Sequence, residues 1–160
     1  MGVSLRPVTS ANWVECIGLE PTEKQRQAMF VSPNVLSLAQ AYAERWWVPL
    51  AIYAGEVMVG FVMYGRWPDE PLSAEWGPRQ PGIHHILRLM VDQRYQGHGY
   101  ARAALKVLIE RVRAEPDARA LETNYDLDNM AADHLYTRLG FRPTGIIDDD
   151  EIRVRLELKL

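Results

Sequence analysis

Two glycines close together in a short turn are the first residues whose type and spacing indicate chemistry. Residues Arg88 to Leu105 read RLMVDQRYQGHGYARAAL, which predicts a strand, a turn that holds Gly97 and Gly99, and then a helix. The free N–H groups and the dipole at a helix start favour an anion, and glycines let that anion approach the backbone. The turn therefore predicts a site for a phosphate-bearing ligand, with a purely structural turn as the alternative.

Two well-known nucleotide-binding loops fit this turn poorly. A P-loop requires Lys and then Ser or Thr after its last glycine, and neither follows Gly99. A dinucleotide-binding loop requires a further glycine three residues after Gly99, where this chain has Arg102, and it requires a parallel βαβ unit. The surrounding elements must therefore decide which ligand the turn holds.

The elements around the turn alternate between strands and helices, without a linker, a repeat or a low-complexity tract. Hairpins at residues 49–65 and near the C-terminus make much of the predicted sheet antiparallel, so the order differs from a repeated βαβ fold. Four prolines between residues 67 and 82 predict a loop long enough to be functional. We expect a mixed α/β sheet in three layers, in which residues 84–91 form the strand that leads to the glycine turn.

Composition and charge restrict the class of protein. The chain has 160 residues, 48% of them hydrophobic, which is sufficient for a sizeable core, and we expect a single domain over residues 1–160. A net charge of -3 provides no general attraction to nucleic acid or to an anionic membrane, so neither partner is expected. The lone Cys16 predicts a buried thiol in a reducing compartment. Because the sequence shows no signal peptide and no span of about 18 apolar residues, we expect a cytoplasmic protein.

Two motifs in the chain resemble those of the GNAT acyltransferase superfamily. The glycine turn is similar to its acetyl-CoA signature, which is Gln or Arg, two residues, Gly, any residue, then Gly or Ala; Arg94, Gly97 and Gly99 match it. The segment NMAADHLYTRLGF is similar to a second motif of the family, and its matching residues are Asn129, Ala132, Leu135, Tyr136, Gly140 and Phe141. Within the superfamily, residues 34–65 are most similar to the bacterial spermine/spermidine N-acetyltransferases.

The resemblance implies the GNAT fold, which is a mixed, largely antiparallel central sheet of about seven strands flanked by helices. It also implies acetyl-CoA as the co-substrate and no metal ion. Backbone groups of Leu89, Met90 and Val91 would line the pantetheine arm and the thioester carbonyl. Asn129 would bond the same arm, with a helix N-cap as the competing interpretation. The residues whose amides would cradle the pyrophosphate are Gln96, Gly97, His98, Gly99, Tyr100 and Ala101.

Acetyl transfer from a thioester to an amine needs a neutral nucleophile, a place for negative charge on the carbonyl oxygen, and a proton for the leaving thiolate. Tyr136 resembles the general acid of the family, which delivers that proton. An aromatic side chain on the core face of the helix is the alternative interpretation of Tyr136.

The group that removes the proton from the amine is harder to identify. Many relatives carry Asp or Glu immediately before Arg88, where this chain has Leu87. We therefore expect the proton acceptor to be His84 or His85 on the same strand, or Glu122 acting through water. An ordinary structural or surface role is the alternative for each of them.

Acidic side chains predict a cationic acceptor, for which a polyamine such as spermidine or spermine is the candidate. We expect Glu75 in the proline-rich loop and Asp126 before the second motif to bind this substrate, with solubility as their alternative role. The run DDDE at residues 148–151 is predicted to be a hairpin turn.

Two functions of different class remain open from the sequence. The first is an acetyl-CoA-dependent N-acetyltransferase that acts on the primary amine of a small molecule. The second is a catalytically silent acyl-CoA-binding module that senses the cofactor or holds a partner. Pairing through the last hairpin would give a homodimer in either case.

Overall fold

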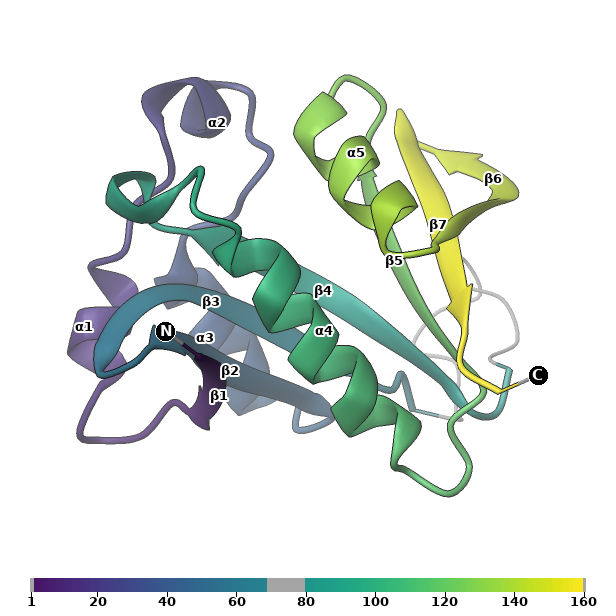
Figure 1. The fold of residues 1–160 in the computed structure, drawn as a ribbon, viewed down its shortest axis with the longest axis horizontal. Coiled ribbons are helices and arrows are strands. Elements are labelled where there is room, and N and C mark those ends of the chain that lie inside the picture. Colours follow the sequence, from purple (N-terminus) through teal and green to yellow (C-terminus); the bar gives the residue numbers. More distant parts are fainter. Residues whose placement is uncertain (1, 69–79, 160) are drawn as a thin grey trace.

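The computed structural model describes residues 2–68 and 80–159 of the chain. In this part of the chain, seven strands form one sheet in the order β1-β2-β3-β4-β5-β7-β6 (Figure 1). Only β4 and β5 are parallel, which confirms the predicted mixed and largely antiparallel sheet. In chain order the elements are β1 (Val3–Pro7), α1 (Trp13–Ile17), α2 (Glu23–Gln27), α3 (Asn34–Ala43), β2 (Trp47–Ala54), β3 (Val57–Gly65), β4 (Ile83–Val91), the 3₁₀ helix η2 (Gln93–Tyr95), α4 (Tyr100–Arg113), β5 (Ala120–Asp126), α5 (Met130–Arg138), β6 (Arg142–Asp148) and β7 (Glu151–Glu157).

The helices cover both faces of the sheet, as the predicted three layers require. On one face, α4 and α5 pack against a core that includes Leu105 and Tyr136. On the other face, α1 and α3 pack against a second core that includes Cys16 and Ala41. Cys16 is fully buried, as predicted, and burial raises the pKa of its thiol to about 12. The thiol is therefore protonated at neutral pH and acts as a small apolar side chain.

The two parallel strands pair along only part of their length. The pairing of β4 with β5 begins at Ile83 and Ala120 and ends at Ile86 and Thr123, although β4 continues to Val91. Figure 1 shows the two strands diverging beyond this point, toward the end of the molecule that carries α2 and α5. An open space between two strands of one sheet exposes backbone groups that a ligand is able to bond.

A β-bulge lies at the place where the strands separate. Met63 of β3 is paired with Arg88 and the next residue, Tyr64, is paired with Ile86, so that Leu87 of β4 has no partner on β3. An extra residue of this kind bends its strand and increases the local twist. The bulge therefore turns the second half of β4 away from β5.

A buried carboxylate fixes the turn that follows β4. Asp92 is 2% exposed, and its two oxygens accept hydrogen bonds from the backbone N–H groups of Glu20 and Arg94. The guanidinium of Arg94 bonds the same carboxylate in a fork, through Nε at 2.8 Å and Nη2 at 3.1 Å. Burial alone would raise the pKa of Asp92, but the hydrogen bonds outweigh it and hold the pKa below its ordinary value. The glycine turn thus starts from a rigid point.

None of the helices in residues 2–68 and 80–159 is long and apolar enough to cross a membrane. The last hairpin, β6 and β7, forms one edge of the sheet, with β6 outermost. Its turn at Asp149 and Asp150 confirms the predicted role of the acidic run, because both residues have the positive φ angles of a tight hairpin turn. The homodimer through this hairpin stays a prediction.

The carboxylate of Asp92 should contribute measurably to stability. Replacing Asp92 by Asn keeps the shape but removes the charge-assisted bonds, so we expect Asp92→Asn to lower the free energy of unfolding by about 2 kcal/mol at pH 7. Because the folded-state pKa lies below 3.8, the contribution is present above that pH and is lost as the pH falls through the folded-state value. Urea unfolding at pH 7 and pH 3 measures both effects. Asp149→Asn, on an exposed turn residue, is the matched control, and equal stability of the two variants would contradict this role for Asp92.

Candidate active site

A cavity of about 480 Å³ lies where β4 and β5 separate. Its walls come from the diverging strands, from the start of α4, from α5 and from the segment that follows α2. This volume lies within the range that ordinary small-molecule sites occupy. Most of the residues that the sequence assigned to a cofactor or to chemistry line the cavity, namely Leu89, Met90, Val91, Gln96, Gly97, Gly99, Tyr100, Ala101, Asp126, Asn129 and Tyr136.

The glycine turn at one end of the cavity is suited to hold an anion. Gly97 and Gly99 have φ angles of 79° and 78°, which side chains disfavour, and a Cβ atom added at either residue would meet nothing within 4 Å. Gly99 is the N-cap of α4 and offers no side-chain cap, so the first N–H groups of this helix are free for a ligand. A phosphate group therefore fits the open space above the turn.

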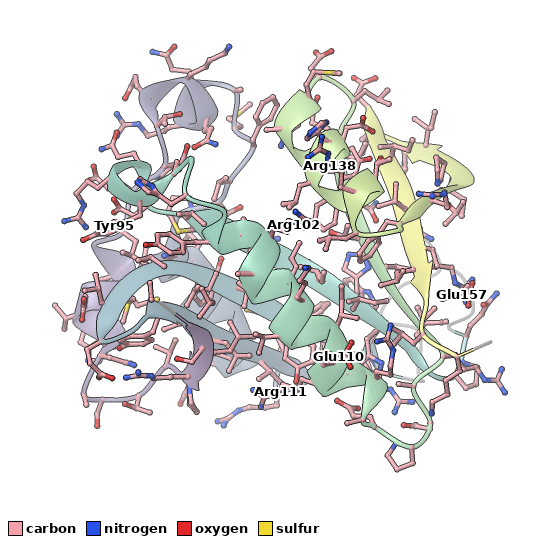
Figure 2. All side chains as sticks on the ribbon, in the orientation of Figure 1. Tyr95, Arg102, Glu110, Arg111, Arg138 and Glu157 are labelled. Carbon is pink, nitrogen blue, oxygen red and sulfur yellow. The ribbon has the colours of Figure 1, made fainter. Side chains whose placement is uncertain are left out.

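Side chains around the turn either brace it or add charge to it. Gln96 donates from Nε2 to the carbonyl oxygen of Val91 and to Oε1 of Gln25, both at 2.9 Å. Nδ1 of His98 lies 2.9 Å from the carbonyl oxygen of Gln96, and His98 does not line the cavity. Arg102, in the first turn of α4, lines the cavity and lies beside the space between α4 and α5 (Figure 2). Its guanidinium matches the charge of a phosphate, a role that the sequence analysis did not assign.

Tyr136 is both a core aromatic and a cavity residue. It is 5% exposed, stacks on Tyr125 with ring centroids 5.6 Å apart, and packs edge-on against Phe141. Burial raises the pKa of Tyr136 well above its ordinary value. The hydroxyl thus stays protonated at neutral pH and is able to donate a proton to a developing anion in the cavity.

Asn129 unites the two interpretations that the sequence left open. Its Oδ1 accepts a hydrogen bond from the N–H group of Ala132 at 3.1 Å, which makes it the N-cap of α5. Asn129 also lines the cavity. The cap holds the side chain in place, and its amide remains available to a ligand.

The structure does not bring the predicted proton acceptors to the cavity. His84 is 1% exposed and its Nε2 lies 2.8 Å from Oε2 of Glu115, because the alternation of β4 points this side chain toward α4. Oε1 of Glu122 lies 3.8 Å from Nη1 of Arg155 on β7. Neither His84 nor Glu122 lines the cavity, since both lie where β4 and β5 are still paired. Glu75 falls outside the described residues.

Three polar residues that the sequence analysis did not assign to the site line the end of the cavity away from the glycine turn: Arg88, Asn124 and Glu151. Asn124 belongs to β5, two residues before Asp126, and Glu151 is the first residue of β7. The register of β5 with β7 places Glu151 directly opposite Asp126. No sequence signal marks this pairing, because Glu151 belongs to a run of four acidic residues that indicates only a turn. Within residues 2–68 and 80–159, no three His, Cys, Asp or Glu side chains form a group that could hold a metal ion.

Comparisons with known proteins agree with this arrangement. The model of the acetyltransferase (GNAT) family matches residues 10–141. The spermine/spermidine N(1)-acetyltransferase of Bacillus subtilis is 26% identical over 148 residues, which are 92% of this chain and 93% of that protein. The L-2,4-diaminobutyric acid acetyltransferase of Streptomyces anulatus is 35% identical over 71 residues, 42% of this chain and 40% of that protein. The structure of the Vibrio cholerae spermidine N-acetyltransferase in complex with CoA and spermine has a TM-score of 0.71 at 14% identity, covering 98% of this chain and 95% of that one.

The open space at Gly97 permits a test of anion binding by charge. Asn and Asp both tolerate the φ of 79°, and neither would clash, so Gly97→Asn and Gly97→Asp should fold alike. Because two like charges about 4 Å apart repel by about 1 kcal/mol or more, the Asp variant should bind coenzyme A about tenfold more weakly than the Asn variant. Isothermal titration with coenzyme A measures the difference, and adding salt should reduce it. Equal affinity of the two variants for coenzyme A would contradict the assignment of the glycine turn as a phosphate-binding site.

Proposed function

The chain belongs to the GNAT acetyltransferase family, and from this premise we propose that it transfers the acetyl group of acetyl-CoA to a primary amine of a small polyamine, such as spermidine or spermine. The observation that carries the proposal is the cavity between β4 and β5, which joins an anion-binding turn to a buried tyrosine and then to carboxylates. The amine attacks the thioester directly, so the protein must position two substrates and move protons.

The cavity offers each part of acetyl-CoA a chemical match. The turn around Gly97 and Gly99 and the guanidinium of Arg102 suit the phosphates. Beyond Ile86 the edge of β4 has no strand partner on β5, so backbone groups from Leu89 to Val91 are available to the amides of the pantetheine arm. Acetyl-CoA would thus lie along the cavity with its phosphates at the start of α4 and its acetyl group near the bulge in β4.

Tyr136 suits the role of proton donor to the leaving thiolate. Its hydroxyl is a neutral donor in a buried place, where a hydrogen bond to a developing anion is stronger than in water. The stacking on Tyr125 and the edge-on contact with Phe141 fix the ring and so fix the position of the hydroxyl. The packing that the sequence analysis weighed as an alternative role supports the catalytic role.

The acidic end of the cavity supports a cationic acceptor. Asp126 lines the cavity, and its carboxylate favours an ammonium group over a neutral alcohol or an anion. The names of two relatives point the same way, because spermine, spermidine and 2,4-diaminobutyric acid each carry more than one amino group. Glu75 remains a proposed second carboxylate for the same substrate.

The silent acyl-CoA-binding module is disfavoured on chemical grounds. A module that only binds the cofactor has no need for a buried proton donor or for an acidic end in the same cavity. Tyr136 and Asp126 are the residues that provide these features, and both line the cavity.

Acetyl transfer is tested directly by release of the CoA thiol in the presence of acetyl-CoA and an amine panel. We expect turnover with spermidine and spermine, weaker turnover with 2,4-diaminobutyric acid and butylamine, and none with butanol, which lacks the nucleophile. Mass spectrometry of the product should show one added acetyl group. Turnover of no amine in the panel would leave only the binding function.

The proton donor is tested by Tyr136→Phe, which keeps the ring stacking and removes only the hydroxyl. Because the donor acts on the thiolate as the C–S bond breaks, kcat should fall by about 10²-fold while the affinity for coenzyme A changes little. The matched control is Tyr125→Phe, which removes the neighbouring hydroxyl that donates to Asp133 instead. If both variants retained the parental kcat, Tyr136 would be only a packing residue.

A further inference from the structure

Glu151 is one of two acidic residues, with Asp126, that lie opposite each other at the end of the cavity away from the glycine turn. This end is the one proposed to hold the acceptor amine. Glu151 opens β7 and lies directly opposite Asp126 of β5 in the antiparallel register, and both residues line the cavity. Like charges directly opposite each other across a ladder destabilise a sheet. An ammonium group placed between them would relieve that repulsion.

The partners of Glu151 show where its carboxylate lies. The amide of Asn124 on β5 and the charge of Arg88 on β4 both lower the pKa of Glu151, so both groups lie near its carboxylate. These two residues belong to opposite walls of the cavity, because β4 and β5 no longer pair beyond Ile86 and Thr123. The carboxylate of Glu151, which interacts with residues of both strands, therefore lies at the gap between β4 and β5. In the proposed reaction the amine approaches the thioester at this gap.

Arg88 balances part of the negative charge at this place. Its Nη1 donates to the carbonyl oxygen of Leu87 at 2.9 Å and its Nη2 to Oε1 of Gln40 at 3.4 Å. In the described part of the chain, no carboxylate lies within 4.0 Å of its guanidinium. The two carboxylates of Glu151 and Asp126 outnumber this one cation, which favours an ammonium group between them.

The surroundings of Glu151 also tune its basicity. Glu151 is exposed overall, but partial desolvation raises the pKa of its carboxyl above the ordinary value, and the charges of Asp126 and Asp148 raise it further. The charge of Arg88 and the nearby amide of Asn124 oppose this rise, but the net pKa shift is upward. A carboxylate with a raised pKa is a stronger base toward an ammonium group.

We propose that Glu151 is the catalytic base that takes the proton from the acceptor ammonium. This assignment rests on the proposed acetyl transfer, and it gives the role of proton acceptor to a residue that lines the cavity, which His84 and Glu122 do not. Asp126 then binds the cation, and Glu151 removes its proton.

The proton balance of the step is complete. The ammonium gives one proton to Glu151, which passes it to water, and the neutral nitrogen forms the C–N bond to the acetyl carbon. The C–S bond breaks, and the thiolate takes the phenolic proton of Tyr136. The nitrogen then loses its second proton, which restores the phenol. The products are the acetylated amine, coenzyme A and one proton released to solvent.

The test compares pH profiles of kcat/KM for Glu151→Gln and the parent protein, with spermidine or, if another panel amine has a higher kcat/KM, with that amine. The parent should lose activity as the pH falls through the pKa of Glu151. In Glu151→Gln we expect kcat to fall by about 10²-fold, and the acid limb set by the pKa of Glu151 to be replaced by one at higher pH that follows the formation of free amine. Binding of coenzyme A, followed by the thermal shift it produces, should be unchanged, which shows that the fold and the turn are intact.

The matched control is Asp150→Asn in the same hairpin. It removes one negative charge at a residue whose φ of 65° Asn tolerates, and Asp150 does not line the cavity. Its kcat and its pH profile should remain parental. Loss of activity in this control comparable to that of Glu151→Gln would overturn the assignment, because hairpin charge in general would then be responsible.

A second variant tests the base without removing it. Asp126→Asn removes a charge that raises the pKa of Glu151, so the acid limb should move to lower pH while KM for the amine rises. An unmoved acid limb in Asp126→Asn, or a parental kcat and acid limb in Glu151→Gln, would overturn the role of Glu151. Failure of the proposed function is a different result, namely that the parent protein acetylates no amine of the panel.

Discussion

The site depends on one constraint, which is that two neighbouring parallel strands stop pairing in the middle of a continuous sheet. Three local features make the separation stable. The bulge at Leu87 bends β4 away from β5. At the last paired position, the hydroxyl of Thr123 donates a hydrogen bond to the carbonyl oxygen of Ile86. The other edge of β5 pairs with β7 along the whole length of β5. Without the separation, backbone groups of β4 would be used within the sheet, and no ligand would reach them.

The separation also divides the chemistry of the cavity by charge. At one end lie the helix start with its glycine turn and Arg102, where the proposed function puts the phosphates, and at the other end lie Asp126 and Glu151, where it puts the amine. A protein with a net charge of only -3 thus creates two opposite local fields about one cavity. Tyr136 lines the same cavity in a buried position, where a charged group would be costly and a neutral hydroxyl suits the proposed role of proton donor.

Residues that support the site from behind explain why it is rigid. Asp92 fixes the turn before the glycines through backbone and guanidinium bonds, and Gln96 bonds the end of β4. Stacked aromatic rings hold Tyr136, and the N-cap bond of Asn129 holds the start of α5. These cavity residues are therefore held in place by the protein itself, which in the proposed reaction reduces the entropic cost of reaching the reactive arrangement.

The sequence by itself determined the features that depend on local geometry. The glycine turn, the helix after it, the hairpin turn at the acidic run and the core face that holds Tyr136 all follow from residue type and spacing over a few positions, because positive φ angles and helical periodicity are local properties. Only the tertiary structure decided which residues of different strands meet. The register of β7 against β5 brings Glu151 opposite Asp126, and the position of His84 and Glu122 before the separation keeps them from the cavity. Strand register and the point of separation are set by packing across the whole sheet, and shifting a strand by one residue would turn its side chains to the other face.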